Sequence, residues 1–510
     1  MYQSKLNEKR QLLVASFHCR PPLNLKAADS QIFNQTNQRI CGFIPLMSLN
    51  RQFSFNILYS SFYIQYFPSF LHGKNLILRP DINLIFMSTP KLSHLAETLS
   101  GSEIVKLGNA ISERIRNGEK IYNLTIGDFD PSVFPIPTEL EELIIDSYRN
   151  KNTSYPSAEG VLDLRKSVAT FIKEWEGLSF EANEIQIAAG GRPLIYTLFK
   201  AIVDKGDKVI YGVPSWNNNH YAHLTDAVHC VVECTPENDF MPTVEDIKKN
   251  ISGATLICIC TPQNPTGTTL KKESLEAICD LILEENAKRG EGEKKCYLMF
   301  DQMYWTLTYG TTVHHNPLHL RPAIKDYTIF IDGISKVFAA TGVRVGWALG
   351  PSTVIAKMKA ILSHVGAWAP MAEQKAVAQY LLQKENIQRY LAHFKSEVEL
   401  RLRNIHDGFI ALKQKGYPVD AIAPQAAIYL TIKIDLVGKT TAEGKKLETQ
   451  SDVTSYILAE AKLAVVPFSA FGAGSNSPWY RLSVGTCKKE EIGEMLEKLE
   501  GALGRLAFSL

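Results

Sequence analysis

ATLICIC (residues 254–260), followed directly by TPQNPTG (residues 261–267), decides the fold class of this chain. The apolar run predicts a buried strand, and the Asn-Pro dipeptide after it predicts a rigid turn at the strand end. Between about Glu139 and Tyr380, further apolar runs alternate with helical stretches. This alternation predicts an α/β fold in which a mainly parallel sheet has helices on both faces.

The other strands of this sheet are predicted at Glu184–Ala188, Lys208–Tyr211, Lys295–Phe300 and Tyr327–Ile331. Each of them runs into polar or glycine-rich sequence. Because ligands of open α/β sheets bind beyond the carboxyl ends of the strands, we expect the chemistry at these ends. After about Lys384, long helices followed by short strands such as Ala427–Ile434 predict a smaller C-terminal lobe.

Length and composition restrict the class of protein. A chain of 510 residues exceeds one domain of usual size, so we expect a large domain with a smaller one. The formal net charge of +2 gives no electrostatic footprint for nucleic acid or an anionic membrane. No apolar run reaches the roughly 18 residues of a membrane span. We therefore expect small-molecule ligands, no nucleic acid and no membrane.

The nine cysteines form no CxxC pair, and Cys258 and Cys260 alternate within one predicted strand. We interpret them as core thiols in a reduced, cytoplasmic compartment, the alternative being a disulfide or metal role. We expect no metal site.

Residues 1–86 are rich in Ser, Asn, Phe and Tyr and contain only three acidic residues, Glu8, Asp29 and Asp81. We expect a dispensable or disordered extension before Met87, with organelle targeting or an accessory role as alternatives. Ile104–Ile115 has the spacing of an amphipathic helix, so the organised chain is expected to start near Met87. The predicted domains are 87–134 with 388–510 (small) and 135–387 (large).

Several predicted strand ends carry polar groups that suit an anionic ligand with a ring. Gly190 and Gly191 precede a predicted helix, whose first N–H groups suit a phosphate, although paired glycines usually only turn the chain. Asn264 lies in the rigid turn. Asp301 ends an apolar strand, where a carboxylate needs a cationic partner such as a protonated ring nitrogen. A helix cap is the alternative role for Asp301.

The last predicted strand leads into Ser335 and Lys336, with Arg344 shortly after. A lysine amine at such a site loses solvation and becomes nucleophilic, and a hydroxyl and a guanidinium nearby suit a phosphate. Pyridoxal phosphate (PLP) needs a lysine for its aldehyde, an acid for its ring nitrogen, donors to its phenolate oxygen and anion ligands for its phosphate. These strand ends offer all four.

From about Gly101 to Leu506 the chain resembles the fold-type I PLP-dependent aminotransferases of class I/II, in particular the bacterial aspartate aminotransferases. The resemblance is carried by Asn264-Pro265-Thr266-Gly267, Asp301-Gln302-Met303-Tyr304, Ser335-Lys336 and Arg344, in the family's order and spacing. It implies a mainly parallel seven-stranded sheet in the large domain, a smaller α+β domain, and transfer of an amino group from an L-amino acid, with aspartate favoured, to a 2-oxo acid.

The resemblance also implies roles for single residues. Lys336 would form the internal aldimine and then carry a proton between Cα and the coenzyme C4′. Asp301 would pair with the pyridinium nitrogen, and Asn264 and Tyr304 would donate to the phenolate oxygen. Trp216 would stack on the ring, the alternative being a core tryptophan.

Further residues would hold the phosphate and the substrate. The phosphate ligands would be Gly190, Gly191, Arg192, Ser335 and Arg344, together with Tyr155 from a neighbouring subunit, which implies a homodimer. Arg481 in Tyr480-Arg481-Leu482-Ser483 would bind the substrate α-carboxylate, next to Asn264 and the backbone of Gly127.

The chain departs from the family pattern at Gly333, where many members carry a second phosphate-binding serine. It also departs at Arg192, which would bind either the phosphate or a distal substrate carboxylate, and at the run Asn217-Asn218-Asn219. Alternatives that share the coenzyme are aromatic or kynurenine aminotransferases, C–S lyases, 1-aminocyclopropane-carboxylate-type synthases and a non-catalytic PLP-sensing regulator.

Overall fold

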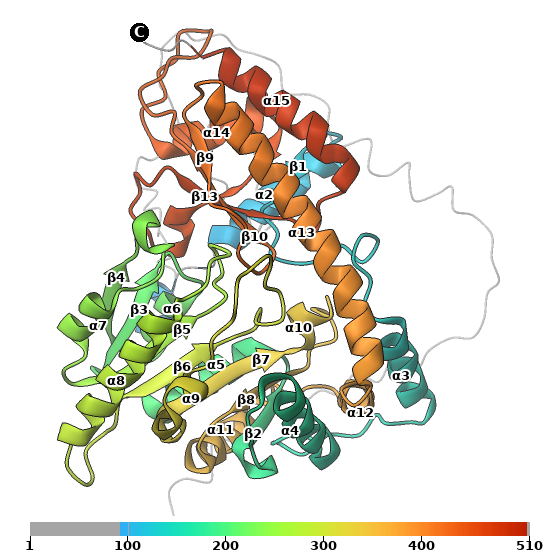
Figure 1. Ribbon diagram of the computed structural model, residues 1–510, viewed down its shortest axis with the longest axis vertical. Coiled ribbons are helices and arrows are strands. Elements are labelled where there is room, and N and C mark those ends of the chain that lie inside the picture. Colours follow the sequence, from blue (N-terminus) through green and yellow to red (C-terminus); the bar gives the residue numbers. More distant parts are fainter. Residues whose placement is uncertain (1–91, 100, 102, 507–510) are drawn as a thin grey trace, which may run out of the picture. The chain divides into compact units, whose positions relative to one another are not determined.

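A seven-stranded sheet lies at the centre of the larger part of the fold, with strand order β2-β8-β7-β6-β5-β3-β4 (Figure 1). The computed structural model describes residues 92–99, 101 and 103–506, so the expectations for residues 1–86 lie outside it. Neighbouring strands are parallel except where β8 pairs with β2 and β7. The predicted mainly parallel α/β sheet is thus confirmed. The strands are β2 Ile185–Ala188, β3 Lys208–Val213, β4 Val228–Glu233, β5 Ala254–Cys260, β6 Tyr297–Asp301, β7 Thr328–Gly333 and β8 Gly346–Leu349.

All five strands located from the sequence are present, with ends shifted by at most two residues. The sequence did not locate β4 and β8. Strand β4 is an edge strand whose Val228 and Val231 are exposed, so it has no continuous apolar run. Strand β8 has only four residues and begins and ends beside glycines.

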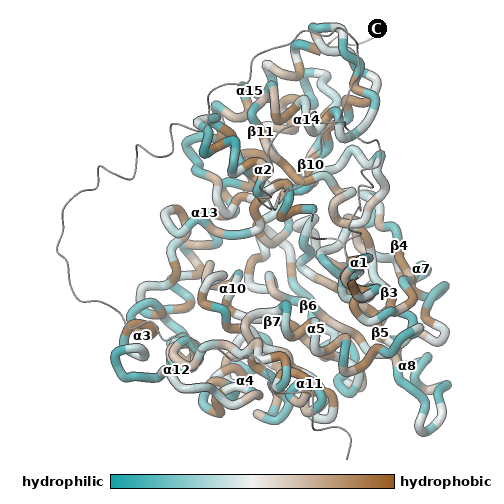
Figure 2. The backbone as a smooth tube through the Cα atoms, turned by 180° about the vertical axis from the view of Figure 1, so that it is seen from behind, coloured by the Kyte–Doolittle hydropathy of each residue, from teal (hydrophilic) through white to brown (hydrophobic). Residues whose placement is uncertain are grey.

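Alternate residues of the central strands pack on opposite faces of the sheet. Leu256 and Cys258 of β5 join one apolar cluster with helices α5 (Gly191–Ile202), α6 (Asn218–His223) and α11 (Ser352–Val365). Ile257 and Ile259 join another with α4 (Leu162–Glu176), α8 (Lys272–Lys288) and α12 (Met371–Tyr380). Figure 2 shows apolar colouring in the neighbouring strands β3 and β5. Helices therefore cover both faces, as predicted.

A second, four-stranded sheet has the order β12-β13-β10-β9, and its strands are antiparallel. The segment that precedes the large sheet in the chain also contacts the C-terminal part, because its strand β1 (Tyr122–Asn123) pairs with β11 (Leu463–Ala464). The long helix α13 (Lys384–Gln414) packs on β9 and α15. The described residues 92–506 all belong to one compact unit, and the domain limits at 134 and 387 stay a prediction. The other elements here are β9 Val419–Ala421, β10 Tyr429–Ile434, β12 Val466–Pro467, β13 Trp479–Ser483, α14 Gln450–Glu460 and α15 Ile492–Gly504.

Helix α2 (Glu103–Arg116) matches the amphipathic helix predicted at residues 104–115. Strand β10 starts two residues later than predicted, because Ala427 has a φ of 61° and belongs to a turn. Among the helices of residues 92–506, none is long and apolar enough to cross a bilayer. The remaining helices are α1 His94–Thr98, α3 Thr138–Arg149, α7 Val244–Asn250, α9 Pro317–Leu320 and α10 Ile334–Val337.

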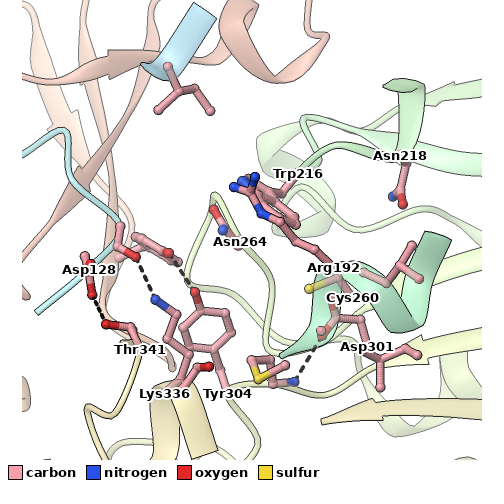
Figure 3. A pocket seen from close by; sticks show the side chains of 18 of the residues that line it. Asp128, Arg192, Trp216, Asn218, Cys260, Asn264, Asp301, Tyr304, Lys336 and Thr341 are labelled. Carbon is pink, nitrogen blue, oxygen red and sulfur yellow. Dashed lines mark hydrogen bonds between the residues drawn. The ribbon is translucent and has the colours of Figure 1, made fainter. Parts of the chain in front are cut away.

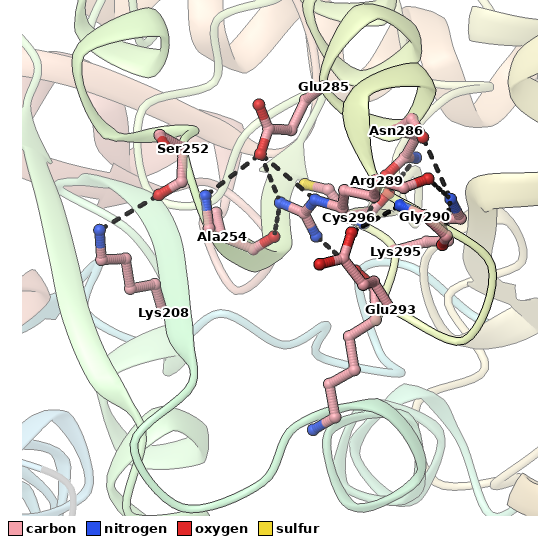
Figure 4. A network of polar contacts seen from close by, with 12 residues as sticks. Lys208, Ser252, Ala254, Glu285, Asn286, Arg289, Gly290, Glu293, Lys295 and Cys296 are labelled. Carbon is pink, nitrogen blue, oxygen red and sulfur yellow. Dashed lines mark hydrogen bonds and ion pairs between the residues drawn. The ribbon is translucent and has the colours of Figure 1, made fainter.

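A polar network ties the end of α8 to the amino ends of β5 and β6 (Figure 4). Arg289 Nη2 donates to Glu285 Oε1 at 2.8 Å and to the Ala254 carbonyl at 2.7 Å. Asn286 exchanges side-chain hydrogen bonds with the backbone of Cys296 at 2.7 and 2.9 Å. Polar groups at this edge of the sheet are thus paired within the chain.

Candidate functional site

The opposite, carboxyl edge of the large sheet borders a cavity of about 580 Å³ (Figure 3). Strands β2, β3, β5, β6 and β7 all end here because they run in one direction, and antiparallel β8 begins here, which brings Arg344 to the same edge. The structure brings eleven predicted site residues to this cavity: Gly127, Gly191, Arg192, Trp216, Asn264, Asp301, Tyr304, Ser335, Lys336, Arg344 and Arg481.

Lys336 lies on the short helix α10, directly after β7, and its amine points into the cavity. Its Nζ donates to the carbonyl of Gly127 at 2.6 Å. Burial lowers the pKa of Lys336 to about 8; Asp128 opposes this shift, and Arg481 and other cations add to it. A substantial neutral fraction near neutral pH is what a nucleophilic amine requires.

Asp301 is the last residue of β6 and lines the cavity. Its Oδ1 accepts the backbone N–H of Met303 at 3.1 Å. Burial raises the pKa of Asp301 to about 6, although the Met303 N–H and the Cys260 thiol stabilise its charged form. No cation of the described residues contributes to this balance. The carboxylate therefore has the environment expected of a group that awaits a cationic ligand.

Arg481 of β13 is 2% exposed and lies between the two sheets. Its Nη1 donates to Asn264 Oδ1 at 3.1 Å and its Nη2 to the Thr125 carbonyl at 2.6 Å. The Nε has no hydrogen-bond partner among residues 92–506. A buried guanidinium bound only to neutral oxygens is well suited to an anionic ligand.

Tyr304 follows β6, and its hydroxyl shares a 2.7 Å hydrogen bond with that of Tyr429 on β10. Tyr429 also packs against the Arg481 guanidinium, 4.9 Å from its ring centroid. A Cβ on Gly127 would come within 2.8 Å of the Tyr429 hydroxyl, so glycine is needed there. Tyr304, Tyr429 and Arg481 therefore form one wall of the cavity.

The other end of the cavity is suited to a phosphate. Helix α5 begins at Gly191 and directs its first N–H groups toward this end. Gly190 does not line the cavity itself, but a Cβ there would lie 2.2 Å from Arg344 Nη2. Arg344 Nη2 donates to the Ala189 carbonyl at 2.6 Å. At Gly333, a Cβ would lie 2.7 Å from the Gly346 Cα, which explains why the chain has no serine there.

Arg192 is exposed to the cavity, and its guanidinium lies 4.6 Å from the ring centroid of Trp216. Trp216 is half-buried and lines the cavity, so it is not a core tryptophan. Asn218, from the unusual asparagine run, lines the cavity as well.

Tyr155 is the one predicted site residue remote from this cavity. It is 88% exposed and lies in a separate surface hollow, where its ring centroid is 5.8 Å from that of Trp368. Its role at the phosphate of a second copy of the chain stays a prediction.

The sequence did not single out Asp128, Thr341 and Tyr429, and it placed Cys260 in the core. That placement is wrong, because Cys260 is half-buried and lines the cavity next to Asp301, whereas Cys258 is buried in the core as predicted. Asp128 Oδ1 accepts from Thr341 Oγ1 at 2.5 Å. Only the position of Asp128, one residue after Gly127, could have pointed to it.

Comparisons with known proteins agree on one family. The family model described as "Aminotransferase class I and II" matches residues 119–499. An aspartate aminotransferase of Rhizobium meliloti is 27% identical over 80% of this chain and 94% of its own length. A probable aspartate/prephenate aminotransferase of Rhizobium leguminosarum is 27% identical over 81% and 99%. The crystal structure of the Rhizobium meliloti aspartate aminotransferase has a TM-score of 0.75 at 26% identity and covers 82% of this chain and 100% of that one.

Proposed function

This chain belongs to the class I and II aminotransferases, which are PLP-dependent enzymes, and we propose that it transfers the amino group of L-aspartate to a 2-oxo acid, with Lys336 as the covalent anchor of the coenzyme. The family acts on amino acids and 2-oxo acids; the choice of aspartate and the role of Lys336 are the proposal. The observation that carries it is the convergence of Lys336, Asp301 and Arg481 on one cavity of about 580 Å³.

The groups that line the cavity fit PLP. Asp301 offers a carboxyl group without a cation, which would pair with the protonated ring nitrogen. Asn264 and Tyr304 would donate to the phenolate oxygen, and Trp216 would cover the ring. The phosphate would be held by the start of α5 with Gly190 and Gly191, by Ser335 and by Arg344. When bound, PLP withdraws electrons from the substrate Cα.

Lys336 is suited to move a proton as well as to bind the coenzyme. Its pKa of about 8 lets the amine accept and return a proton near neutral pH. The hydrogen bond from Nζ to the Gly127 carbonyl fixes the amine on the side of the cavity where Arg481 also lies. The amine would therefore face the Cα of a substrate whose carboxylate Arg481 binds.

Two arginines support a dicarboxylic substrate. Arg481 would bind the α-carboxylate, since its Nε is unpaired and its Nη atoms have only neutral acceptors. Arg192 is held on the face of Trp216 and forms none of the ion pairs found within residues 92–506. Its guanidinium is therefore available to the distal carboxylate of aspartate, while Arg344 and Ser335 serve the phosphate.

The proposal includes a homodimer, in which the exposed Tyr155 would reach the phosphate in a second copy. It also includes a reducing, cytoplasmic location, supported by seven cysteines that are all free in the described part of the chain.

The test uses the full chain loaded with PLP and given L-aspartate without any oxo acid. We expect the yellow absorbance of the bound coenzyme to move to the near-ultraviolet pyridoxamine form, with one oxaloacetate released per site. Conversion by aromatic amino acids but not by aspartate would reject the substrate assignment. A protein that takes up no PLP colour would reject the proposal as a whole.

A further inference from the structure

The segment from Asp301 to Trp305 has a cavity side and a buried side. Asp301 and Tyr304 face the cavity. Gln302 is fully buried and donates from Nε2 to Glu176 Oε1 at 2.7 Å. Trp305 donates from Nε1 to Asp332 Oδ2 at 2.9 Å. The segment that supplies two coenzyme ligands is therefore held from behind by side chains that never reach the cavity.

Asp332 lies in the strand end that leads to Lys336. It is 1% exposed, and its Oδ1 accepts the backbone N–H of Gly333 at 2.7 Å. Burial, followed by the nearby Glu176 carboxyl group, raises the pKa of Asp332 well above its usual range. Each Asp332 carboxyl oxygen accepts one hydrogen bond, from Gly333 or from Trp305, and this pair of hydrogen bonds is the main role of the group.

The backbone behind Lys336 has little freedom to move. A Cβ on Gly333 would lie 2.8 Å from the Val345 carbonyl oxygen, and the Ile334 N–H donates to that same carbonyl at 3.2 Å. The Lys336 segment is thereby fixed against β8. The hydrogen bond from Trp305 to Asp332 connects this fixed segment to the one that carries Tyr304.

We propose that Asp332, acting through Trp305, is a positioning residue that sets the place of Tyr304 relative to Lys336. The inference rests on the proposed function, because it assigns Tyr304 to the phenolate oxygen of the coenzyme. Without the Trp305 hydrogen bond, the Tyr304 hydroxyl would be less well placed to stabilise that oxygen when it is negatively charged. The visible absorbance band of the bound coenzyme would then titrate at higher pH.

The experiment compares two Trp→Phe variants of the PLP-loaded enzyme. Trp305→Phe removes the donor and keeps an aromatic ring. Trp347→Phe is the matched control, since Trp347 also packs on Phe171, with ring centroids 6.4 Å apart, but its Nε1 has no partner among the described residues. We expect Trp305→Phe to raise the pKa of the absorbance band by roughly half a unit or more. Trp347→Phe should lower the melting temperature and leave that pKa unchanged.

A double-mutant cycle tests the partner. Asp332→Ala should raise the absorbance pKa at least as much as Trp305→Phe does, and the double variant should rise no further than Asp332→Ala alone, because both changes remove the Trp305–Asp332 hydrogen bond. If Asp332→Ala does not fold, the comparison of Trp305→Phe with Trp347→Phe still tests the positioning role. A Trp305→Phe enzyme that titrates like wild type, or equal shifts in both Trp→Phe variants, would overturn the inference. Failure of the wild type to bind PLP would instead reject the proposed function.

Discussion

The pKa values of carboxyl groups at the two edges of the large sheet are shifted in opposite directions. At the amino edge, Glu285 and Arg289 have side chains 11% exposed each and are joined at 2.8 Å. Burial is the largest single influence there and opposes ionisation of Glu285, but the hydrogen bonds from Arg289 and from the Gly253 N–H, together with the positive charge of Arg289, outweigh it and lower the pKa of the carboxyl group. At the carboxyl edge, burial raises the pKa of Asp301 to about 6 and no cation compensates.

The difference separates a structural carboxylate from a functional one. Within the Glu285–Arg289 pair the two charges neutralise each other, and Arg289 connects α8 to β5 through its hydrogen bond to the Ala254 carbonyl. Asp301 and Arg481 leave charge and hydrogen-bonding capacity for something outside the chain. Uncompensated groups of opposite sign on one cavity are what a coenzyme with a cationic ring nitrogen and a substrate with a carboxylate would need.

The strongest effect on activity should come from Asp301→Asn. The amide cannot stabilise a positive ring nitrogen, so kcat/KM for aspartate should fall by about 10²- to 10³-fold. The melting temperature of the coenzyme-free protein should not fall, because a buried carboxyl group without a cation is removed. Glu285→Gln should do the reverse, lowering the melting temperature while activity is retained. If Asp301→Asn had the kcat/KM of wild type, Asp301 would not be a functional carboxylate and would not differ from Glu285 in this way.

The largest effect on stability should come from Arg289→Ala. The change leaves Glu285 without its cation and the Ala254 and Lys294 carbonyls without a donor. We expect the free energy of unfolding to fall by about 3 kcal/mol, measured by denaturant titration. Arg403→Ala is the control at the more exposed i,i+4 pair with Glu399, where a loss below about 1 kcal/mol is expected. Equal losses would mean that the amino edge has no special role.

A smaller effect concerns the pH dependence of stability. Burial raises the pKa of Glu176, which faces Gln302, Asn316 and the Asp332 carboxyl group, from 4.5 to about 7. The folded state therefore holds a proton that the unfolded state has lost, and stability falls as pH rises from about 4.5 to about 7. The melting temperature of wild type relative to Glu176→Gln should decrease across this window.

Glu285→Gln is the matched comparison, because the folded pKa of Glu285 is lowered. Its contribution to stability is fully present above the unfolded pKa and is lost only as pH falls below it. The difference between wild type and Glu285→Gln should therefore stay nearly constant between about pH 5.5 and 7. If the stability of wild type fell with rising pH relative to both Glu176→Gln and Glu285→Gln, the two carboxyl groups would not differ in their pH dependence.

One side of this contrast, the set of polar groups at the carboxyl edge, could be predicted from the sequence, whereas the Glu285–Arg289 pair at the amino edge was not predicted. Apolar runs located β5, β6 and β7, and the polar residues after them placed Asn264, Asp301 and Lys336 at one edge. Strand β4 was missed because an exposed edge strand lacks an apolar run, and β8 because it has only four residues.

The rest of the site depends on contacts between distant segments. Tyr429 belongs to the second sheet, and only folding brings its hydroxyl to Tyr304. Asp128 comes from a loop, and its side chain is hydrogen-bonded to Thr341 at the wall of the cavity. The buried contacts of Trp305 and Glu176 could not be predicted from a single sequence, because the residues around them do not indicate which distant side chain each one contacts.

The most direct test of the central claim is to reduce the PLP-loaded enzyme with borohydride and to find the labelled residue by peptide mass spectrometry. The reduction makes the bond between the coenzyme and its lysine permanent. The account predicts a single coenzyme label on Lys336 and none in Lys336→Ala. A label on another lysine, or an equally labelled Lys336→Ala variant, would contradict it.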